Sequence, residues 1–167
     1  MKIVNVHERD YGVLDSTLGA LVDGLSSKND RLWPARQWPS MRLNGPLAVG
    51  ASGGHGRIRY NVEAYEPGRH LRLRFTAPPG FVGTHSFEVV PRSGETRLRH
   101  VLDMEAMGIA RVSWPLVYRP LHDALLEDLL DRAAIAVGVP TQGTRWSTRV
   151  RVLRWLLSRR RLLPVRS

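Results

Sequence analysis

The sequence contains no cysteine, which excludes disulfides, thiol nucleophiles and cysteine-ligated metal sites. No apolar run approaches the roughly 18 residues that a membrane-spanning helix needs. Charged side chains already occur within the first eight residues, so we expect no secretory signal. A hydrophobic fraction of 43% excludes a chain that is disordered throughout. For 167 residues we therefore expect one soluble, cytoplasmic domain with a sizeable core.

Acidic residues are missing from the last 27 residues, which hold eight arginines. The formal net charge of +10 therefore belongs mainly to this tail, because residues 1–140 carry 17 basic and 15 acidic side chains. We expect a nearly neutral domain over residues 1–139 and a basic extension over residues 140–167. Nucleic acid is an unlikely partner, since no recognisable nucleic-acid-binding element accompanies the charge.

Runs that alternate apolar and polar residues predict strands with one buried face. Four such runs are joined by short turn signals that contain proline and glycine, which indicates an antiparallel meander. They cover Arg57–Tyr65, His70–Phe75, Gly83–Val90 and Thr96–Met104, and Lys2–Arg9 and Met41–Val49 are two further candidates.

Two segments have the pattern of helices. A short helix is predicted over Leu18–Leu25, after N-cap candidates in Asp15–Thr17. A long amphipathic helix is predicted over Pro115–Val137, followed by Gly138 and Pro140 as stop signals. One long helix on one antiparallel sheet makes the predicted fold class α+β.

The order of these elements resembles the START-like (SRPBCC) superfamily, which includes polyketide cyclases and lipid-transport proteins. Ser52–Ile58 is similar to the glycine-rich loop of its pollen-allergen branch, and Trp114–Leu125 resembles the start of the last helix in its bacterial polyketide cyclase/dehydrase proteins. The resemblance covers about Met1 to Val139. It implies a helix-grip fold, in which a curved antiparallel sheet wraps around a long C-terminal helix, with short helices after the first strand. It also implies a hydrophobic cavity between the sheet and the helix.

Strand parity and helix spacing predict which side chains line such a cavity. The predicted lining residues are Tyr60, Val62, Phe75, His85, Phe87, His100, Leu102, Met104, Val117, Leu121 and Leu125. A rim is predicted from Trp33 and Trp38 in a proline-rich connection and from the loop with Gly53, Gly54, His55 and Gly56.

His85 and His100 are the most informative polar residues, because both share the parity of apolar neighbours. Three interpretations stay open at this point: structural core histidines, ligand contacts, or a general acid/base. A metal site would need a third ligand in addition to histidines such as His55 and His122, so we expect no metal and no other cofactor.

The tail has an amphipathic pattern over Thr144–Leu163. Its candidate contact residues are Trp146, Arg149, Val150, Leu153, Arg154 and Leu157. Tryptophan and leucine opposite arginine are typical of a helix at a membrane surface. Packing on the domain, self-association, and nucleic-acid binding or disorder are the alternatives for the tail.

The function that these observations favour is binding, or transport, of a hydrophobic or amphipathic small molecule in the cavity. One alternative is an enzyme of the polyketide cyclase/dehydrase type that uses a cavity histidine. The other is a peripheral membrane protein that handles lipids and is anchored by its tail.

Overall fold

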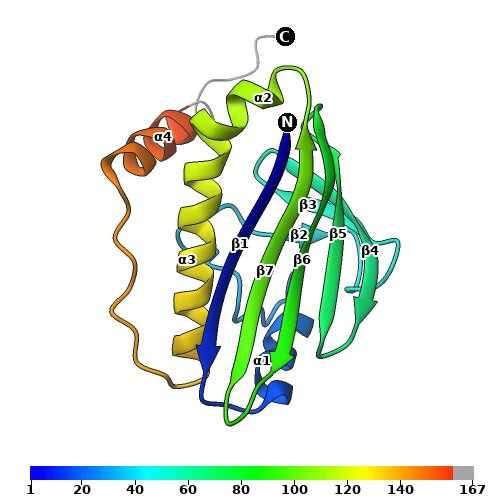
Figure 1. Cartoon of the computed structure of the whole chain (residues 1–167), viewed down its shortest axis with the longest axis vertical. Helices are drawn as coiled ribbons and strands as arrows, with labels where there is room; N and C mark the ends of the chain where they lie inside the picture. The colour runs from blue at the N-terminus through cyan, green and yellow to red at the C-terminus, as the bar shows by residue number, and fades with distance from the viewer. Residues whose placement is uncertain (160–167) are drawn as a thin grey trace.

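The computed structural model describes residues 1–159, and seven of their strands form one antiparallel sheet in the order β1-β7-β6-β5-β4-β3-β2. The sheet is curved, and the long helix α3 lies along it (Figure 1). The strands are β1 (Lys2–Tyr11), β2 (Arg42–Leu43), β3 (Ser52–His55), β4 (Ile58–Glu66), β5 (His70–Ala77), β6 (Phe81–Pro91) and β7 (Thr96–Ala106). The helices are α1 (Asp15–Asp23), α2 (Ala110–Ser113), the π-helix η1 (Trp114–Tyr118), α3 (Arg119–Ala136) and α4 (Thr148–Arg159). The predicted α+β helix-grip architecture is confirmed.

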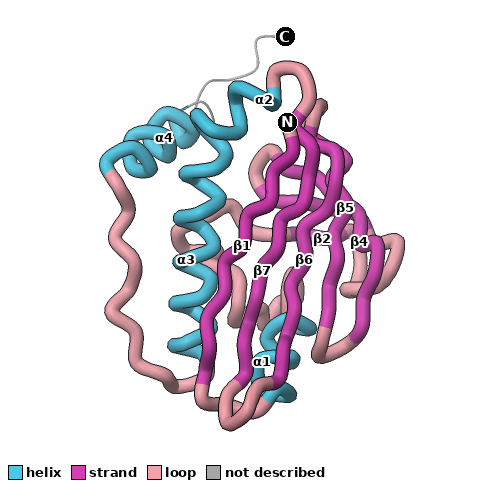
Figure 2. Tube along the Cα trace, in the orientation of Figure 1, coloured by secondary structure: helices cyan, strands magenta, loops and turns pink. Residues whose placement is uncertain are grey.

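The predicted meander is present as β4 to β7, joined by short turns (Figure 2). Its register places His85 opposite Leu102 and Phe87 opposite His100 on neighbouring strands. Along the whole of β7, the even-numbered residues are buried and the odd-numbered residues between them are more exposed. Period-two parity therefore identifies the inner face of the sheet correctly.

The region of β2 and β3 differs from the sequence prediction. The strand expected over Met41–Val49 is only the two residues Arg42–Leu43, and the Ser52–His55 part of the expected loop is itself a strand. The neighbouring strands leave no room for a side chain at Gly53 or Gly54. A Cβ added to Gly53 would lie 1.9 Å from the Arg42 carbonyl oxygen, and one added to Gly54 would lie 2.0 Å from the Ile58 carbonyl oxygen. Glycine serves here for close strand approach, so these two residues belong to the sheet and not to the predicted rim.

The long helix begins earlier than predicted and contains an irregular turn. Helical structure runs from Ala110 through the π-helix η1 to Ala136, instead of from Pro115 to Val137. Pro115 and Pro120 have no amide hydrogen, which removes donors from the regular ladder and accounts for the wider turn at Trp114–Tyr118. The predicted stop holds, because Gly138 has a φ of +76°.

The short helix α1 also begins earlier than predicted, at Asp15, and its N-cap is Leu14. The predicted N-cap candidates in Asp15–Thr17 lie inside the helix, and no side-chain hydrogen bond caps it. Among the described residues, α1 is the one α-helix between β1 and β2. Its buried face packs toward the lower end of the sheet in the view of Figure 1.

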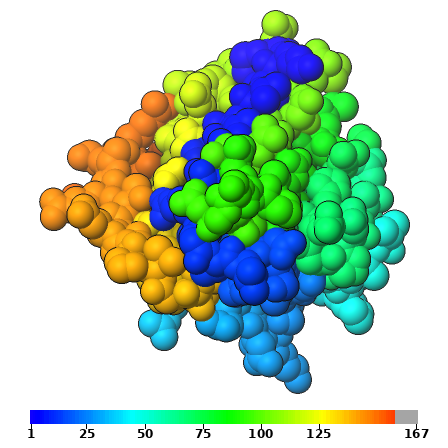
Figure 3. All heavy atoms as spheres, turned by 60° about the horizontal axis from the view of Figure 1, so that its bottom comes forward, coloured from blue at the N-terminus to red at the C-terminus, as the bar shows by residue number. Residues whose placement is uncertain are grey.

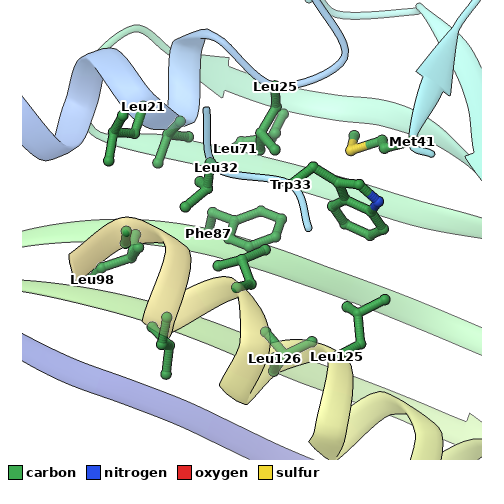
Figure 4. Packing of buried hydrophobic residues seen from close by; sticks show 14 of the residues in the cluster. Leu21, Leu25, Leu32, Trp33, Met41, Leu71, Phe87, Leu98, Leu125 and Leu126 are labelled. Atoms are coloured by element: carbon green, nitrogen blue, oxygen red, sulfur yellow. The ribbon is translucent and has the colours of Figure 1, made fainter. Parts of the chain in front are cut away.

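The main hydrophobic core lies between the sheet, α1 and α3. Figure 4 shows Phe87 of β6 lying between Leu32 and the α3 residues Leu125 and Leu126. A smaller cluster contains Phe81, Met104 and Trp114 at the other end of the sheet. The helical segment Ala110–Ala136 therefore packs against the sheet near both of its ends.

The chain after α3 returns along the same side of the molecule and ends in α4. The orange segment beside the yellow helix α3 in Figure 3 is this return. The amphipathic pattern expected over Thr144–Leu163 is helical from Thr148, while Leu163 and the arginines beyond Arg159 lie outside the described residues. None of the described helices combines the length and the apolarity that crossing a bilayer requires.

Candidate ligand-binding cavity

A cavity of about 560 Å³ lies between the inner face of the sheet, the first turns of α3 and the connection that follows α1. Aromatic and aliphatic side chains form most of its wall, and its polar side chains include four histidines, three arginines and one glutamine. The wall consists of Trp33, Arg36, Gln37, Trp38, Pro39, His55, Gly56, Arg57, Ile58, Phe75, Phe81, His85, Phe87, His100, Leu102, Trp114, Val117, Tyr118, Leu121, His122, Leu125, Leu126, Arg154 and Leu157. The volume falls within the range of small-molecule sites in proteins.

Most of the predicted lining residues come together in this wall. They are Phe75, His85, Phe87, His100, Leu102, Val117, Leu121 and Leu125, with Trp33, Trp38, His55 and Gly56 at the end expected to form the rim. The agreement follows from strand parity and helical spacing, which decide the face on which a side chain lies.

Five predicted residues do not line the cavity. Tyr60 and Val62 are on the inner face, but both are buried in the main core. Met104 belongs to the smaller cluster with Phe81 and Trp114. Gly53 and Gly54 are held within β3. Parity correctly placed Tyr60, Val62 and Met104 on the inner face of the sheet, but neighbouring side chains separate them from the cavity.

The two central histidines form a buried pair on the sheet. His85 Nδ1 lies 3.1 Å from His100 Nε2, so one ring donates a hydrogen bond to the other. The side chains are 6% and 2% exposed, and burial lowers the pKa of each well below its ordinary value. Both rings are therefore neutral near pH 7. His85 Nε2 and His100 Nδ1 have no hydrogen-bond partner within residues 1–159.

His55 is a third histidine of the cavity wall and lies on the side of the connection that follows α1. Its Nδ1 lies 3.2 Å from the Tyr60 hydroxyl, and its ring lies 4.8 Å from that of Trp33. Burial, together with the neighbouring His122 and Arg59, lowers the pKa of His55 to about 3. Burial also raises the pKa of the Tyr60 hydroxyl above its ordinary value. Both groups are therefore uncharged hydrogen-bonding groups near pH 7.

On the other side of His100, the ring of His122 lies beside a charged cluster between α3 and β1. His7 of β1 bonds Asp123 at 3.2 Å and Glu127 at 2.9 Å. Burial alone would lower the pKa of His7, but these two carboxylates outweigh it and raise the pKa. His7, Asp123 and Glu127 are not among the predicted site residues. The usable signal was parity, since His7 shares the alternation of the buried residues Ile3 and Tyr11.

The tail residues lie against the domain. Asp128 of α3 accepts hydrogen bonds from the indole nitrogens of Trp38 at 2.6 Å and Trp146 at 2.9 Å. The guanidinium of Arg154 lies 4.4 and 3.9 Å from the centres of the two indole rings, respectively. Val150 is 4% exposed, and the Arg149 guanidinium donates to the carbonyl groups of η1. Leu157 and Arg154 also form part of the cavity wall, so α4 closes one side of the cavity.

Solved structures share this architecture, although no family model and no curated protein sequence matches the chain. CalU16 from Micromonospora echinospora superposes with a TM-score of 0.58 at 12% identity, over 94% of this chain and 84% of that one. Norcoclaurine synthase from Thalictrum flavum gives a TM-score of 0.61 at 12% identity, over 85% and 90%. The likeness shows that the chain has the helix-grip fold of these structures. A Thermobifida fusca protein gives 0.61 at 16% identity, over 83% and 97%.

The cavity of this chain lies between the sheet and the last long helix. At identities of 12 to 16%, the likeness concerns the fold, while the wall residues are particular to this chain. The chemistry of the site therefore has to be argued from those residues.

Proposed function

We propose that the protein binds a hydrophobic or amphipathic small molecule in the cavity between the sheet and α3. The observation that carries this proposal is the wall itself. Imidazole nitrogens that have no hydrogen-bond partner among residues 1–159 lie there among aromatic and aliphatic side chains. An apolar cavity with a few convergent polar groups is the usual form of a small-molecule site.

The histidines define the polar end of the expected ligand. A buried polar atom without a partner costs about 1–3 kcal/mol, and His85 Nε2 and His100 Nδ1 are two such atoms among the described residues. A ligand hydroxyl or carbonyl group would satisfy one of them. Since both rings are neutral, a neutral polar group fits this end better than a carboxylate.

The aromatic part of the wall favours a ligand that contains a ring. Phe75 stacks on His85 with ring centres 4.9 Å apart, and Phe81 meets Phe75 edge to face at 5.7 Å. Such rings offer both faces and edges to another aromatic system. One structural neighbour, norcoclaurine synthase, has been solved in complex with dopamine and hydroxybenzaldehyde. That complex supports a small aromatic compound with polar substituents as the ligand class here.

Native mass spectrometry of the purified protein tests the proposal, because a bound molecule adds a defined mass that denaturation removes. Val117→Trp fills the cavity and is expected to abolish this extra mass and the binding of the hydrophobic dye 8-anilinonaphthalene-1-sulfonate. Leu116→Trp is the matched control, since Leu116 is the preceding residue and is 55% exposed. The proposal fails if neither a co-purified molecule nor dye binding is found, or if Val117→Trp binds as well as Leu116→Trp.

The hydrogen-bonded pair His85–His100 favours a second candidate, an enzyme of the polyketide cyclase/dehydrase type. A neutral imidazole that faces a bound carbonyl group can donate or accept a proton. Once the bound compound is identified, its conversion by the protein is followed by mass analysis. His85→Ala and His100→Ala should then stop turnover while the compound still binds. Unchanged turnover in both variants would remove these histidines from the reaction.

The outer side of α4 is the remaining basis for the membrane candidate. Val152 and Leu156 are 50% and 48% exposed on a helix that carries arginines and no acid. Vesicles with anionic lipid should therefore carry the protein upward in a flotation gradient. The double variant Val152→Glu and Leu156→Glu should stay at the bottom, and equal flotation of both proteins would exclude this surface.

A further inference from the structure

A separate polar cluster lies where β1 meets the start of α3, at the outer edge of the cavity. His7, His122 and Asp123 each present one ligand atom there, and these atoms all lie within 4.8 Å of one another. His7 Nε2 is 3.2 Å from Asp123 Oδ1, and His122 Nδ1 is 3.6 Å from the same oxygen. Two imidazole nitrogens therefore approach a single carboxylate oxygen from different elements of the fold.

These distances match those between ligands of one metal ion. Nitrogen and oxygen ligands lie about 2.1 Å from a zinc ion, so two of them at a tetrahedral angle are about 3.4 Å apart. The two measured distances, 3.2 and 3.6 Å, lie on either side of that value. We propose that His7, His122 and Asp123 form a binding site for a divalent transition-metal ion such as Zn²⁺.

The state of His122 supports this proposal independently of the distances. Its side chain is 17% exposed, but both ring nitrogens are buried, and neither comes within 3.5 Å of a hydrogen-bond partner in the described part of the chain; Asp123 Oδ1, at 3.6 Å from Nδ1, lies just beyond that distance. A buried nitrogen without a partner is costly. Coordination of Nδ1 would satisfy one of the two nitrogens.

The surroundings of His7 also resemble those of a metal ligand. Its second nitrogen, Nδ1, lies 2.9 Å from Glu127 Oε1. A carboxylate on the far nitrogen orients a ligating imidazole and increases its basicity. Arg119 Nε lies 3.7 Å from the other oxygen of Asp123, Oδ2, and so leaves Oδ1 facing the two histidines. Asn5 donates to Oδ1 at 3.1 Å, and an ion would take over that contact.

Two histidines and one carboxylate leave at least one coordination position for another ligand. His122 also belongs to the cavity wall, so that position lies near the cavity. The metal proposal does not rest on the proposed ligand, because its three residues bind the ion by themselves. From the sequence alone no metal is expected, because no third ligand is evident there, and the proposed site has one in His7 of β1.

Isothermal titration of the full-length, chelator-treated protein with ZnCl₂ tests the site. We expect one Zn²⁺ per chain in the wild type and at least tenfold weaker binding in His122→Gln and in Asp123→Asn. His122→Gln is the informative variant for folding, since the ring that it removes makes no described hydrogen bond. His70→Gln removes a histidine outside the cluster and should bind Zn²⁺ as the wild type does.

Two further measurements separate this site from other histidines of the cavity. Co²⁺ should give the wild type visible absorption bands that change in Asp123→Asn, which reports coordination rather than stability. His85→Gln should keep Zn²⁺ binding, because His85 is not a ligand in this site. The proposal is overturned if the wild type binds no Zn²⁺, if His122→Gln and Asp123→Asn bind it normally, or if His85→Gln alone loses it.

Discussion

We expect acid to destabilise the native protein through the imidazoles in its cavity, and His85 provides the sharpest test. This side chain is 6% exposed, and burial lowers its pKa well below the ordinary value, with His55 and His122 adding to the effect. In the unfolded chain a histidine accepts a proton near pH 6.5. Below that pH the unfolded state therefore binds more protons than the native state, and the free energy of unfolding decreases as the pH falls.

The size of the effect follows from linkage. A histidine that stays neutral in the native state lowers the free energy of unfolding by about 1.4 kcal/mol for each pH unit below about 6.5. The loss continues until the pH reaches the pKa of the native state. His85→Leu replaces the ring with an apolar side chain that does not titrate. Below about pH 6.5, the variant should therefore show a dependence on pH that is shallower by about 1.4 kcal/mol per unit.

Urea unfolding between about pH 7.5 and about pH 5.0 measures these slopes. Phe87→Leu is the matched control, because Phe87 lies on the same strand and in the same cavity wall but does not titrate. It should lower stability by a similar amount at every pH and leave the slope unchanged. Equal slopes for the wild type and His85→Leu would refute the argument that the native state keeps this imidazole neutral.

Three further changes test the packing around the site, each by urea unfolding. Gly53→Ala should cost about 1–3 kcal/mol, because its Cβ would overlap the carbonyl oxygen of Arg42, whereas Gly45→Ala has nothing within 4 Å and should be nearly neutral. Asp128→Ala should cost about 2 kcal/mol by leaving two indole donors without an acceptor, and Asp128→Asn should cost less than half of that because its amide oxygen still accepts. Tyr11→Phe should cost about 1–2 kcal/mol through loss of the buried bond to the Leu130 carbonyl. Equal stability of the paired variants would contradict the first two predictions.

The sequence was sufficient for the elements that depend on local periodicity. Alternation along β6 and β7 predicted that His85, Phe87, His100 and Leu102 share one face, and these residues meet in the cavity wall. Helical spacing did the same for Leu121 and Leu125. These predictions succeed because the backbone of a strand or helix decides the face of each side chain within a few residues.

Local patterns failed where a backbone irregularity or a neighbouring strand intervened. The π-helix at Trp114–Tyr118 contains Pro115 and is followed by Pro120, and the short strand β3 exists because β2 and β4 pair with it on both sides. Tyr60 has the correct parity for the cavity, but it lies in the core behind His55 and His85. Whether a side chain on the inner face reaches a cavity depends on the volume of its neighbours.

The amino-acid sequence by itself determined the α+β class, the antiparallel meander, the long helix and the histidine-bearing face of the sheet. Only the tertiary structure brought His7 to within 3.2 Å of Asp123, which is 116 residues away, and placed the indoles of Trp38 and Trp146 on one carboxylate. The same packing turned the arginine-rich tail, at least up to Leu157, into part of the cavity wall. Periodicity is a property of the local backbone, whereas contacts between distant segments depend on how complete faces pack against one another.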